Sequence, residues 1–292
     1  MSVDLIPRYQ SLGFRLVYWE RRGSDPAAWK GPSGIDAKGW NEPSRIYPIE
    51  QFNPTYMNLG VFTGHEVSQD KFLGDVDFDW ADGLPLARTI IPSTGFGFGR
   101  KGKKLSHAFF TTPDRLGITT YDDITDDGSE GNGLRFVELR GGTSTHQTMI
   151  APSLHSPDVY IELVMSGVLL HVETKILEQA VLDYAIACLL LKRLPGGLHH
   201  DGRIALAGFL LRAGFSAART LLIGEAICSE QVVRRVNDMS ARDVADMTLV
   251  VNTTLERITK KDKKVAGGPK LAEFIGERGK AMLQRLRSWI DK

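Results

Sequence analysis

The sequence predicts an α+β protein in which a strand-rich part is followed by a helical part. Up to about Val172, short runs of β-branched and aromatic residues are separated by Gly, Pro, Asn and Asp, which is typical of strands joined by turns. From about Glu173 onward, apolar residues recur three and four positions apart, the spacing of amphipathic helices. A length of 292 residues suffices for two domains. We therefore expect one domain over residues 1–172 and a second over residues 173–292.

The individual elements follow from these runs and from the residues that interrupt them. The predicted strands, with a few helices between them, are FRLVYWE, MNLGVFTG, KFLGDVDFD, SHAFFTT, LRFVELRGG, QTMIAPS and VYIELVM. The first long helix is KILEQAVLDYAIACLLLKRL, and LPGGLHHDGR ends it because Pro and paired Gly interrupt a helix. A small helical bundle follows, made of IALAGFLLRAGF, SAARTLLIGEAIC, EQVVRRVNDM, ARDVADMTLVVNTTLERIT and a last helix from Lys270 to Ile290.

Composition and charge argue against a strongly basic nucleic-acid-binding protein, a disulfide-rich protein, a zinc protein and a membrane protein. The 36 basic and 35 acidic residues give a formal net charge of +1, so affinity for nucleic acid has to come from local patches. One patch is the segment from Glu256 to Lys292, with 11 basic and 5 acidic residues, although a solvated linker and helix face explains it equally well. Cys188 and Cys228 have no partner at ligand spacing, which argues against disulfides and zinc. Without a signal-peptide pattern or a membrane-spanning run, we expect a cytoplasmic protein.

The run FLGDVDFDW carries aspartates at alternate positions, Asp75, Asp77 and Asp79. Alternate residues of a strand share a face, so these like charges lie side by side. A divalent cation is the simplest partner that stabilises adjacent carboxylates, and oxygen ligands favour Mg²⁺ or Mn²⁺. The alternative is a solvated edge strand whose outer face is acidic.

Glycine and basic residues follow in the segment STGFGFGRKGKKLSHAFF. Its glycines allow a flexible or tightly turned backbone, and Arg100, Lys101, Lys103 and Lys104 form a basic cluster that can receive a triphosphate. His107 immediately precedes the predicted strand AFF, which places a candidate phosphate donor at the mouth of that strand. The alternatives are a solvated hairpin tip for the basic cluster and a satisfied core residue for the histidine.

Glu138 lies between two apolar residues of the predicted strand LRFVELRGG, and Arg140 shares its face. A carboxylate inside a buried strand needs a partner. A metal site that Glu138 completes together with Asp75 and Asp77 supplies one, and Arg140 can then pair with phosphate or with Glu138. A plain surface ion pair between Glu138 and Arg140 is the alternative.

Taken in order, these segments resemble the archaeo-eukaryotic primase superfamily, and within it the bifunctional primase-polymerase domain of phage, plasmid and prophage replication proteins. The family pattern is a D-x-D strand, a strand start with a small residue two positions before a His, and a strand with a third acidic residue. GDVDFD, LSHAFF and FVELRGG follow this order, except that Leu105 stands where the family has a small residue and Ser106 is adjacent to His107. Further matches are KGWNEPS, NLGVFTG, QTMIAPSLH and, for the helical domain that follows such a core, LPGGLHHDGRIALAGFLLRAGF. The resemblance implies mixed sheets with flanking helices in two lobes that form a cleft, followed by a small all-α domain.

The resemblance also implies an activity and the residues that carry it. The activity is that of a DNA primase and DNA polymerase, in which a 3′-hydroxyl attacks the α-phosphorus of a nucleoside triphosphate on a single-stranded DNA template. Asp75, Asp77 and Glu138 would bind two Mg²⁺ or Mn²⁺ ions, and Asp79 would support the site from outside the metal pair. The implied nucleotide-binding residues are Arg100, Lys103, Lys104, Ser106, His107, Arg140, Ser153 and His155.

Alternative hypotheses use the same residues differently. A polymerase that only extends primers or repairs ends needs the same site, and paired carboxylates also serve metal-dependent nucleases. A replication-origin DNA-binding module could keep the acidic strand for structural reasons alone. No G-x-x-x-x-G-K-[ST] loop is present, so the expected partners are template, primer, triphosphates and a separate helicase, without a membrane.

Overall fold

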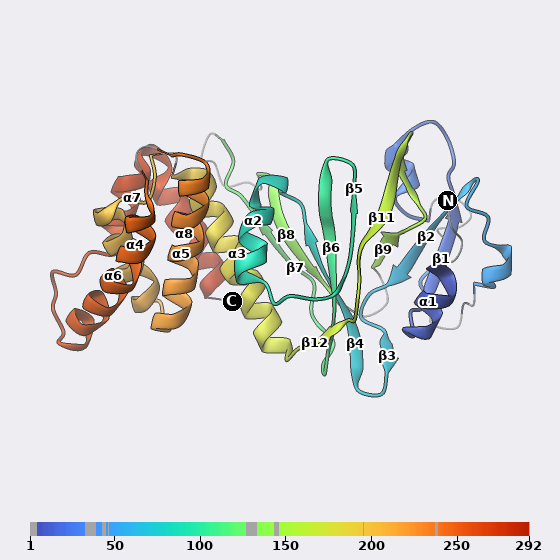
Figure 1. Cartoon of the computed structure of the whole chain (residues 1–292), viewed down its shortest axis with the longest axis horizontal. Coiled ribbons are helices and arrows are strands. Elements are labelled where there is room, and N and C mark those ends of the chain that lie inside the picture. The colour runs from blue at the N-terminus through green and yellow to red at the C-terminus, as the bar shows by residue number, and fades with distance from the viewer. Residues whose placement is uncertain are drawn as a thin grey trace. The chain divides into compact units, whose positions relative to one another are not determined.

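The computed structural model describes residues 5–32, 39–42, 45, 47–126, 133–142, 146–194, 196–236 and 239–291. Within KGWNEPS, Lys38, Pro43 and Ser44 lie outside the described residues. Strands dominate as far as His171 and helices dominate from Thr174 onward, so the predicted α+β class is confirmed (Figure 1). The sheets contain antiparallel pairs such as β4–β6, and β12 pairs with β6 in parallel. No helix among the described residues is long and apolar enough to cross a membrane.

The larger sheet has the strand order β10, β11, β5, β6, β4, β8 and β7, and its central strands lie side by side in Figure 1. β4 and β6 run antiparallel, with Asp75 opposite Phe109 and Asp77 opposite His107. β3 pairs with β4, and β12 pairs with β6. The bounds are β3 Glu66–Ser68, β4 Lys71–Phe78, β5 Phe96–Arg100, β6 Lys103–Thr112, β7 Thr119–Asp122, β8 Arg135–Arg140, β10 Leu154–Ser156, β11 Val159–Ser166 and β12 Leu170–His171.

A smaller antiparallel sheet has the strand order β1, β2 and β9. The Tyr9 hydroxyl of α1 donates a hydrogen bond to the Ala151 carbonyl just after β9, at 3.1 Å. This bond fastens the N-terminal helix to the end of the small sheet. The bounds are α1 Leu5–Ser11, β1 Leu16–Glu20, β2 Met57–Phe62 and β9 Gln147–Ile150, with 3₁₀ helices η1 Pro26–Trp29 and η3 Ile49–Gln51 between β1 and β2.

Aromatic side chains form a core on the face of the sheet that carries Asp75 and His107, because residues directly opposite each other in a strand pair share a face. Tyr9, Phe14, Phe96, Phe98 and Phe109 are all buried, and their ring centroids lie 5.3–6.4 Å apart. Pairs at these separations contribute about 0.5–1.5 kcal/mol each beyond the area they bury. Because Phe109 lies opposite Asp75 across the β4–β6 pair, this core holds the backbone that presents the acidic residues.

β5 and β6 form a tight hairpin where the sequence predicted a glycine-rich loop. Arg100 pairs with Lys103 across a two-residue turn. Gly102 in this turn has φ +83°, a left-handed conformation that glycine adopts without the penalty of a side chain. β6 starts at Lys103, so His107 lies inside the strand, and its predicted place immediately before the strand was wrong.

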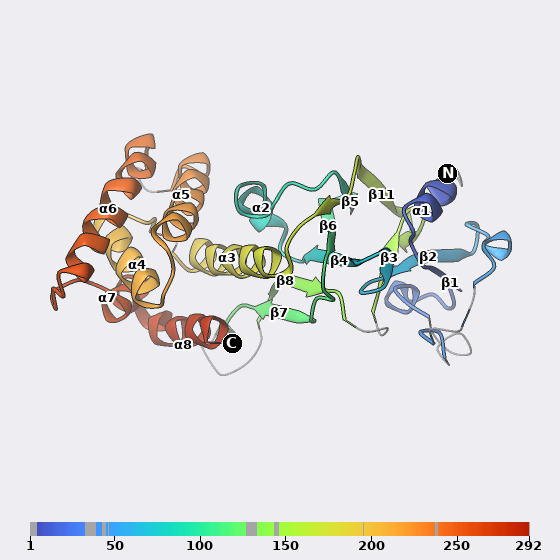
Figure 2. The same cartoon turned by 90° about the horizontal axis from the view of Figure 1, so that it is seen from below.

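The helices of the second part begin at recognisable capping residues. Ser216 Oγ accepts from Arg219 N–H at the start of α5, and the Asp243 carboxylate accepts from Ser240 N–H at the start of α6. The helices α4, α5 and α6 pack against one another (Figure 2). The bounds are α2 Leu84–Ile90, α3 Thr174–Arg193, α4 His200–Arg212, α5 Ala217–Val233, α6 Ala241–Thr259, α7 Gly268–Ile275 and α8 Gly279–Ile290, with 3₁₀ helices η4 Ala81–Gly83 and η5 Gly276–Arg278.

The last predicted helix is two helices in the structure. α7 ends at Ile275, Gly276 has φ +81°, and α8 starts at Gly279. A positive φ is incompatible with a continuing right-handed helix. The stripe from Lys270 to Ile290 was therefore wrong on continuity. It predicted the burial of Leu271, Met282, Leu283 and Leu286, whereas Phe274 is 42% exposed.

The described chain divides into two compact units that are not contiguous in sequence. The predicted division between residues 172 and 173 stays a prediction. The first unit comprises Met1–Ala81, Ser93–Thr120 and Glu138–Glu178, and the second comprises Asp82–Pro92, Tyr121–Val137 and Gln179–Lys292.

Candidate active site

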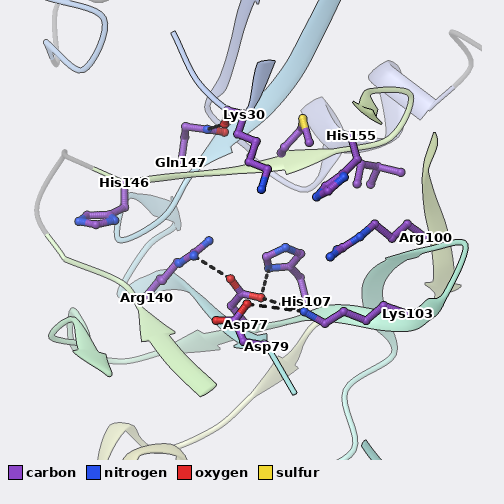
Figure 3. Close-up of a pocket in the computed structure, with 12 residues that line it drawn as sticks. Lys30, Asp77, Asp79, Arg100, Lys103, His107, Arg140, His146, Gln147 and His155 are labelled. Carbon is purple, nitrogen blue, oxygen red and sulfur yellow. Dashed lines mark hydrogen bonds and ion pairs between the residues drawn. The ribbon is translucent and has the colours of Figure 1, made fainter. Parts of the chain in front are cut away.

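A cavity of about 320 Å³ lies within the first unit, and side chains of both sheets line it (Figure 3). This volume is at the lower end of the range for small-molecule sites. The larger sheet contributes β4, β5, β6, β8, β10 and β11, and the smaller sheet contributes β9. The lining residues are Lys30, Asp77, Asp79, Arg100, Lys103, His107, Arg140, His146, Gln147, Met149, His155 and Ile161.

Strand β4 places Asp75 and Asp77 on one face but at different depths. Asp75 is fully buried, and its Oδ2 accepts from Thr148 Oγ1 at 2.5 Å and lies 3.0 Å from His107 Nδ1. Asp77 lines the cavity, with its Oδ1 3.6 Å from the same histidine nitrogen. Asp75 therefore orients the ring of His107, while Asp77 presents a carboxylate to the cavity.

Arg140, at the end of β8, binds carboxylates from two strands. Its Nη2 lies 2.6 Å from Glu138 Oε2 and 2.7 Å from Asp77 Oδ2, and its Nε donates to the same Glu138 oxygen at 2.8 Å. Its Nη1 is 4.0 Å from Asp75 Oδ2. The Glu138–Arg140 pair exists but is buried, because the two side chains are 7% and 20% exposed. The carboxylates predicted to bind metal therefore gather around one guanidinium.

Neighbouring charges decide the protonation of this cluster. Burial alone would raise the pKa of Asp77, but His107, Arg140 and Lys103 outweigh burial and lower that pKa. Burial also disfavours the charged ring of His107, but Asp75 and Asp77 outweigh burial and raise its pKa. Asp77 is thus held ionised, and the His107 ring favours its protonated form.

Lys103 lies buried beside the acidic residues, at the start of β6. Its Nζ is 3.9 Å from Asp77 Oδ1 and 3.7 Å from Asp79 Oδ1. Burial lowers the pKa of Lys103, although both aspartates oppose the shift. Asp79 follows the last residue of β4, its side chain is 33% exposed, and it lines the cavity beside Asp77.

The other basic residues of the hairpin point in different directions. Arg100 lines the cavity, and its Nη1 donates to Ser106 Oγ at 2.8 Å. Lys101 and Lys104 are exposed and lie outside the cavity lining. Within the predicted basic cluster, Arg100 and Lys103 therefore reach the cavity, and the buried Ser106 positions Arg100.

Lys30, Gln147 and His155 lie across the cavity from Asp77 (Figure 3). Gln147 Nε2 donates to the Lys30 carbonyl at 2.8 Å, which ties the loop after η1 to β9. The sequence predicted His155 but missed Lys30, Gln147 and His146. The run HQTMIAPSLH contained a signal for the last two, since polar residues there open a strand, whereas a lysine in a Gly- and Pro-containing loop carries none.

Ser153, which was predicted to line the pocket, is fully buried and lies outside the cavity lining. Its Oγ accepts from Leu59 N at 2.8 Å and donates to Leu59 O at 2.9 Å. Asn58 adds two further bonds, from its Nδ2 to Leu154 O and from Leu154 N to its Oδ1, both at 2.9 Å. Ser153 therefore fastens β10, and with it His155, to β2.

His155 is expected to titrate well below a free histidine. Burial, together with the positive charges of Arg100 and Lys30, lowers its pKa to about 4 from 6.5. Because the unfolded chain takes up this proton near pH 6.5 and the folded chain does not, protonation destabilises the fold as the pH falls from 6.5 toward 4. NMR titration of the imidazole should give a midpoint near 4, and His155→Gln should flatten the fall in melting temperature; a midpoint near 6.5 would contradict the prediction.

The chemistry of the carboxylate cluster fits a hard divalent cation. Asp75, Asp77 and Glu138 offer only oxygen atoms, the ligands that Mg²⁺ and Mn²⁺ prefer. In the part of the chain that the structure describes, no three His, Cys, Asp or Glu side chains stand close enough to hold a metal ion as they are. The guanidinium of Arg140 lies between Asp77 and Glu138 instead.

The site joins segments that are far apart in the sequence, from Lys30 to Ile161, into one cavity with acidic and basic sides. No family model, no curated protein and no solved structure matches the chain.

Proposed function

We propose that the protein is a metal-dependent nucleotidyltransferase of the archaeo-eukaryotic primase type, which makes primers and extends them on a single-stranded DNA template. One observation carries the proposal. The carboxylates of Asp75, Asp77 and Glu138 gather around the guanidinium of Arg140, beside a cavity that Lys30, Arg100 and Lys103 also line. A nucleoside triphosphate needs both environments, since its phosphates bind metal ions as well as Arg and Lys side chains.

Asp75, Asp77 and Glu138 are the residues that would hold two Mg²⁺ or Mn²⁺ ions. When bound, such ions lower the pKa of the attacking 3′-hydroxyl and neutralise charge on the leaving phosphate oxygens. The chain's own contribution is to bind and orient the reactants. Arg100 and Lys103 supply positive charge to the phosphates.

Two further residues add positive charge to the cavity lining. Lys30 brings a charge from the loop after η1, which no sequence motif indicated. His107 lines the cavity with its ring oriented by Asp75, so its favoured protonated form can donate to a phosphate. Lys30 would thus contact a highly charged ligand from across the cavity, while His107 and Lys103 would contact it from beside Asp77.

Incubating the protein with single-stranded DNA, Mg²⁺ or Mn²⁺ and labelled nucleoside triphosphates, without primer, tests the proposal. We expect products whose composition follows the template and whose synthesis needs both metal and triphosphates. Synthesis from a supplied primer alone would restrict the activity to primer extension.

Two other outcomes would point to the alternative functions. Release of nucleotides from the DNA without added triphosphates would indicate a nuclease. DNA binding with no synthesis, with or without primer, would overturn the polymerase proposal and favour an origin-binding module.

A further inference from the structure

We propose that Arg140 is an internal counter-ion, which occupies the carboxylate cluster of the metal-free protein and has to leave it before a divalent cation binds. The proposal rests on the metal site of the proposed function. The guanidinium stands where the negative charge converges, 2.6 Å from Glu138 Oε2, 2.7 Å from Asp77 Oδ2 and 4.0 Å from Asp75 Oδ2.

The cluster needs a cation when no metal is bound. The side chains of Asp75, Asp77 and Glu138 are 0%, 8% and 7% exposed, so water screens their mutual repulsion poorly. His107 neutralises part of the charge of Asp75, and Lys103 stays 3.9 Å from Asp77. Arg140 makes hydrogen bonds to Glu138 and an ion pair with Asp77 at once, which its planar fork of donors allows.

A divalent cation cannot bind these oxygens while Arg140 stays in place. Mg²⁺ lies about 2.0–2.1 Å from its ligand oxygens. Nη2 of Arg140 occupies the gap between Asp77 Oδ2 and Glu138 Oε2, so its contacts have to break when those oxygens turn to a metal. A guanidinium left within a few ångström of the ion would also repel it, because the carboxylates around it are at most 8% exposed and water screens the repulsion poorly.

The Arg140 side chain can move into the cavity that it lines. Its side chain is 20% exposed and lines the cavity, whereas Asp75 and Glu138 lie outside the lining. A guanidinium displaced into the cavity meets the space assigned to the triphosphate, where it gains a phosphate as its new partner. Metal and nucleotide would then favour each other's binding, because each stabilises the displaced position of Arg140.

Binding of Mn²⁺ without nucleotide, followed by EPR, tests the proposal. Arg140→Gln should bind Mn²⁺ at least about tenfold more tightly than the wild type, because the competing cation is gone. Arg140→Lys, which keeps the charge but loses the fork, should lie between the two. The matched control is Arg100→Gln, which removes a cavity arginine bonded to Ser106 and should change Mn²⁺ affinity far less.

Thermal unfolding monitors the fold of each variant. Without metal, Arg140→Gln should melt below the wild type, and Mn²⁺ should raise its melting temperature more than that of the wild type. If Arg140→Gln does not fold, the affinity of Arg140→Lys decides. Unchanged or weaker Mn²⁺ binding by the deciding variant overturns the proposal and leaves the proposed function standing. Absence of Mn²⁺ binding in every protein overturns both.

Discussion

Asp77→Asn is expected to lower template-dependent nucleotide incorporation by more than about 100-fold. Removing a residue that only orients a metal ligand costs up to about 100-fold, and the loss of a ligand itself should cost more. Asp77 lines the cavity and lies within 4.0 Å of cationic groups of Arg140, His107 and Lys103. Asparagine keeps the shape of the side chain but removes its charge, so these cations, and the metal ion we propose, would lose a common partner. Initial rates on a primed single-stranded template with Mn²⁺ measure the effect.

Asp79→Asn is the matched control for this experiment. Asp79 lies beyond the end of β4 and contacts Lys103 at 3.7 Å, so we expect its variant to retain substantial activity. Asp75→Asn should lose activity as Asp77→Asn does, since Asp75 also orients His107. Full activity of Asp77→Asn, or full loss in all three folded variants, would show that the roles of these aspartates were assigned wrongly.

Asp123→Ala is expected to lower the free energy of unfolding by about 3–5 kcal/mol, the cost of breaking a buried ion pair. In the second unit, Asp123 is fully buried and accepts from Arg193 Nε at 3.0 Å and from Arg193 Nη2 at 2.6 Å, with Lys192 Nζ 2.7 Å away. Alanine would leave the 7% exposed Arg193 without its two-pronged partner in the interior. Urea unfolding followed by circular dichroism measures the change.

Two further variants make this experiment specific. Asp126→Ala should cost less than about 1 kcal/mol, because Asp126 is 89% exposed although it also contacts Arg193, at 3.2 Å. The double variant Asp123→Leu with Arg193→Met should recover much of the lost stability, since no charge then stays buried. A cost below about 1 kcal/mol for Asp123→Ala alone would contradict the buried ion pair.

In strand β4 the sequence predicted which side chains share a face but not how deeply each is buried. Alternation placed Asp75 and Asp77 on one face, because the two-residue period is a property of any strand. Their different depths could not be predicted, because Asp75 is covered by His107 and Thr148, which lie 32 and 73 residues away along the chain. Burial depends on which strands pair, and local pattern carries no information on that pairing.

Two glycine-containing segments show what local pattern could not decide. The glycines before His107 are compatible with a loop or with a hairpin, and the pairing of Arg100 with Lys103 decided for the hairpin. The apolar stripe of the last helix continues through Gly276, and the positive φ of that residue divides α7 from α8. In both places glycine permits a positive φ, and the sequence alone does not show whether the chain adopts it.

Local pattern was enough to separate the strand-rich part from the helical part and to predict the chemical types of side chain at the candidate site, because periodicity and residue identity are properties of short segments. It divided α5 (Ala217–Val233) into two helices and missed β5. Long-range packing was needed to place Arg140 among Asp75, Asp77 and Glu138 and to bring Lys30 to the opposite wall of the cavity. Distances between charges, and hence their pKa values and their competition for a metal, arise only when separate strands assemble into sheets.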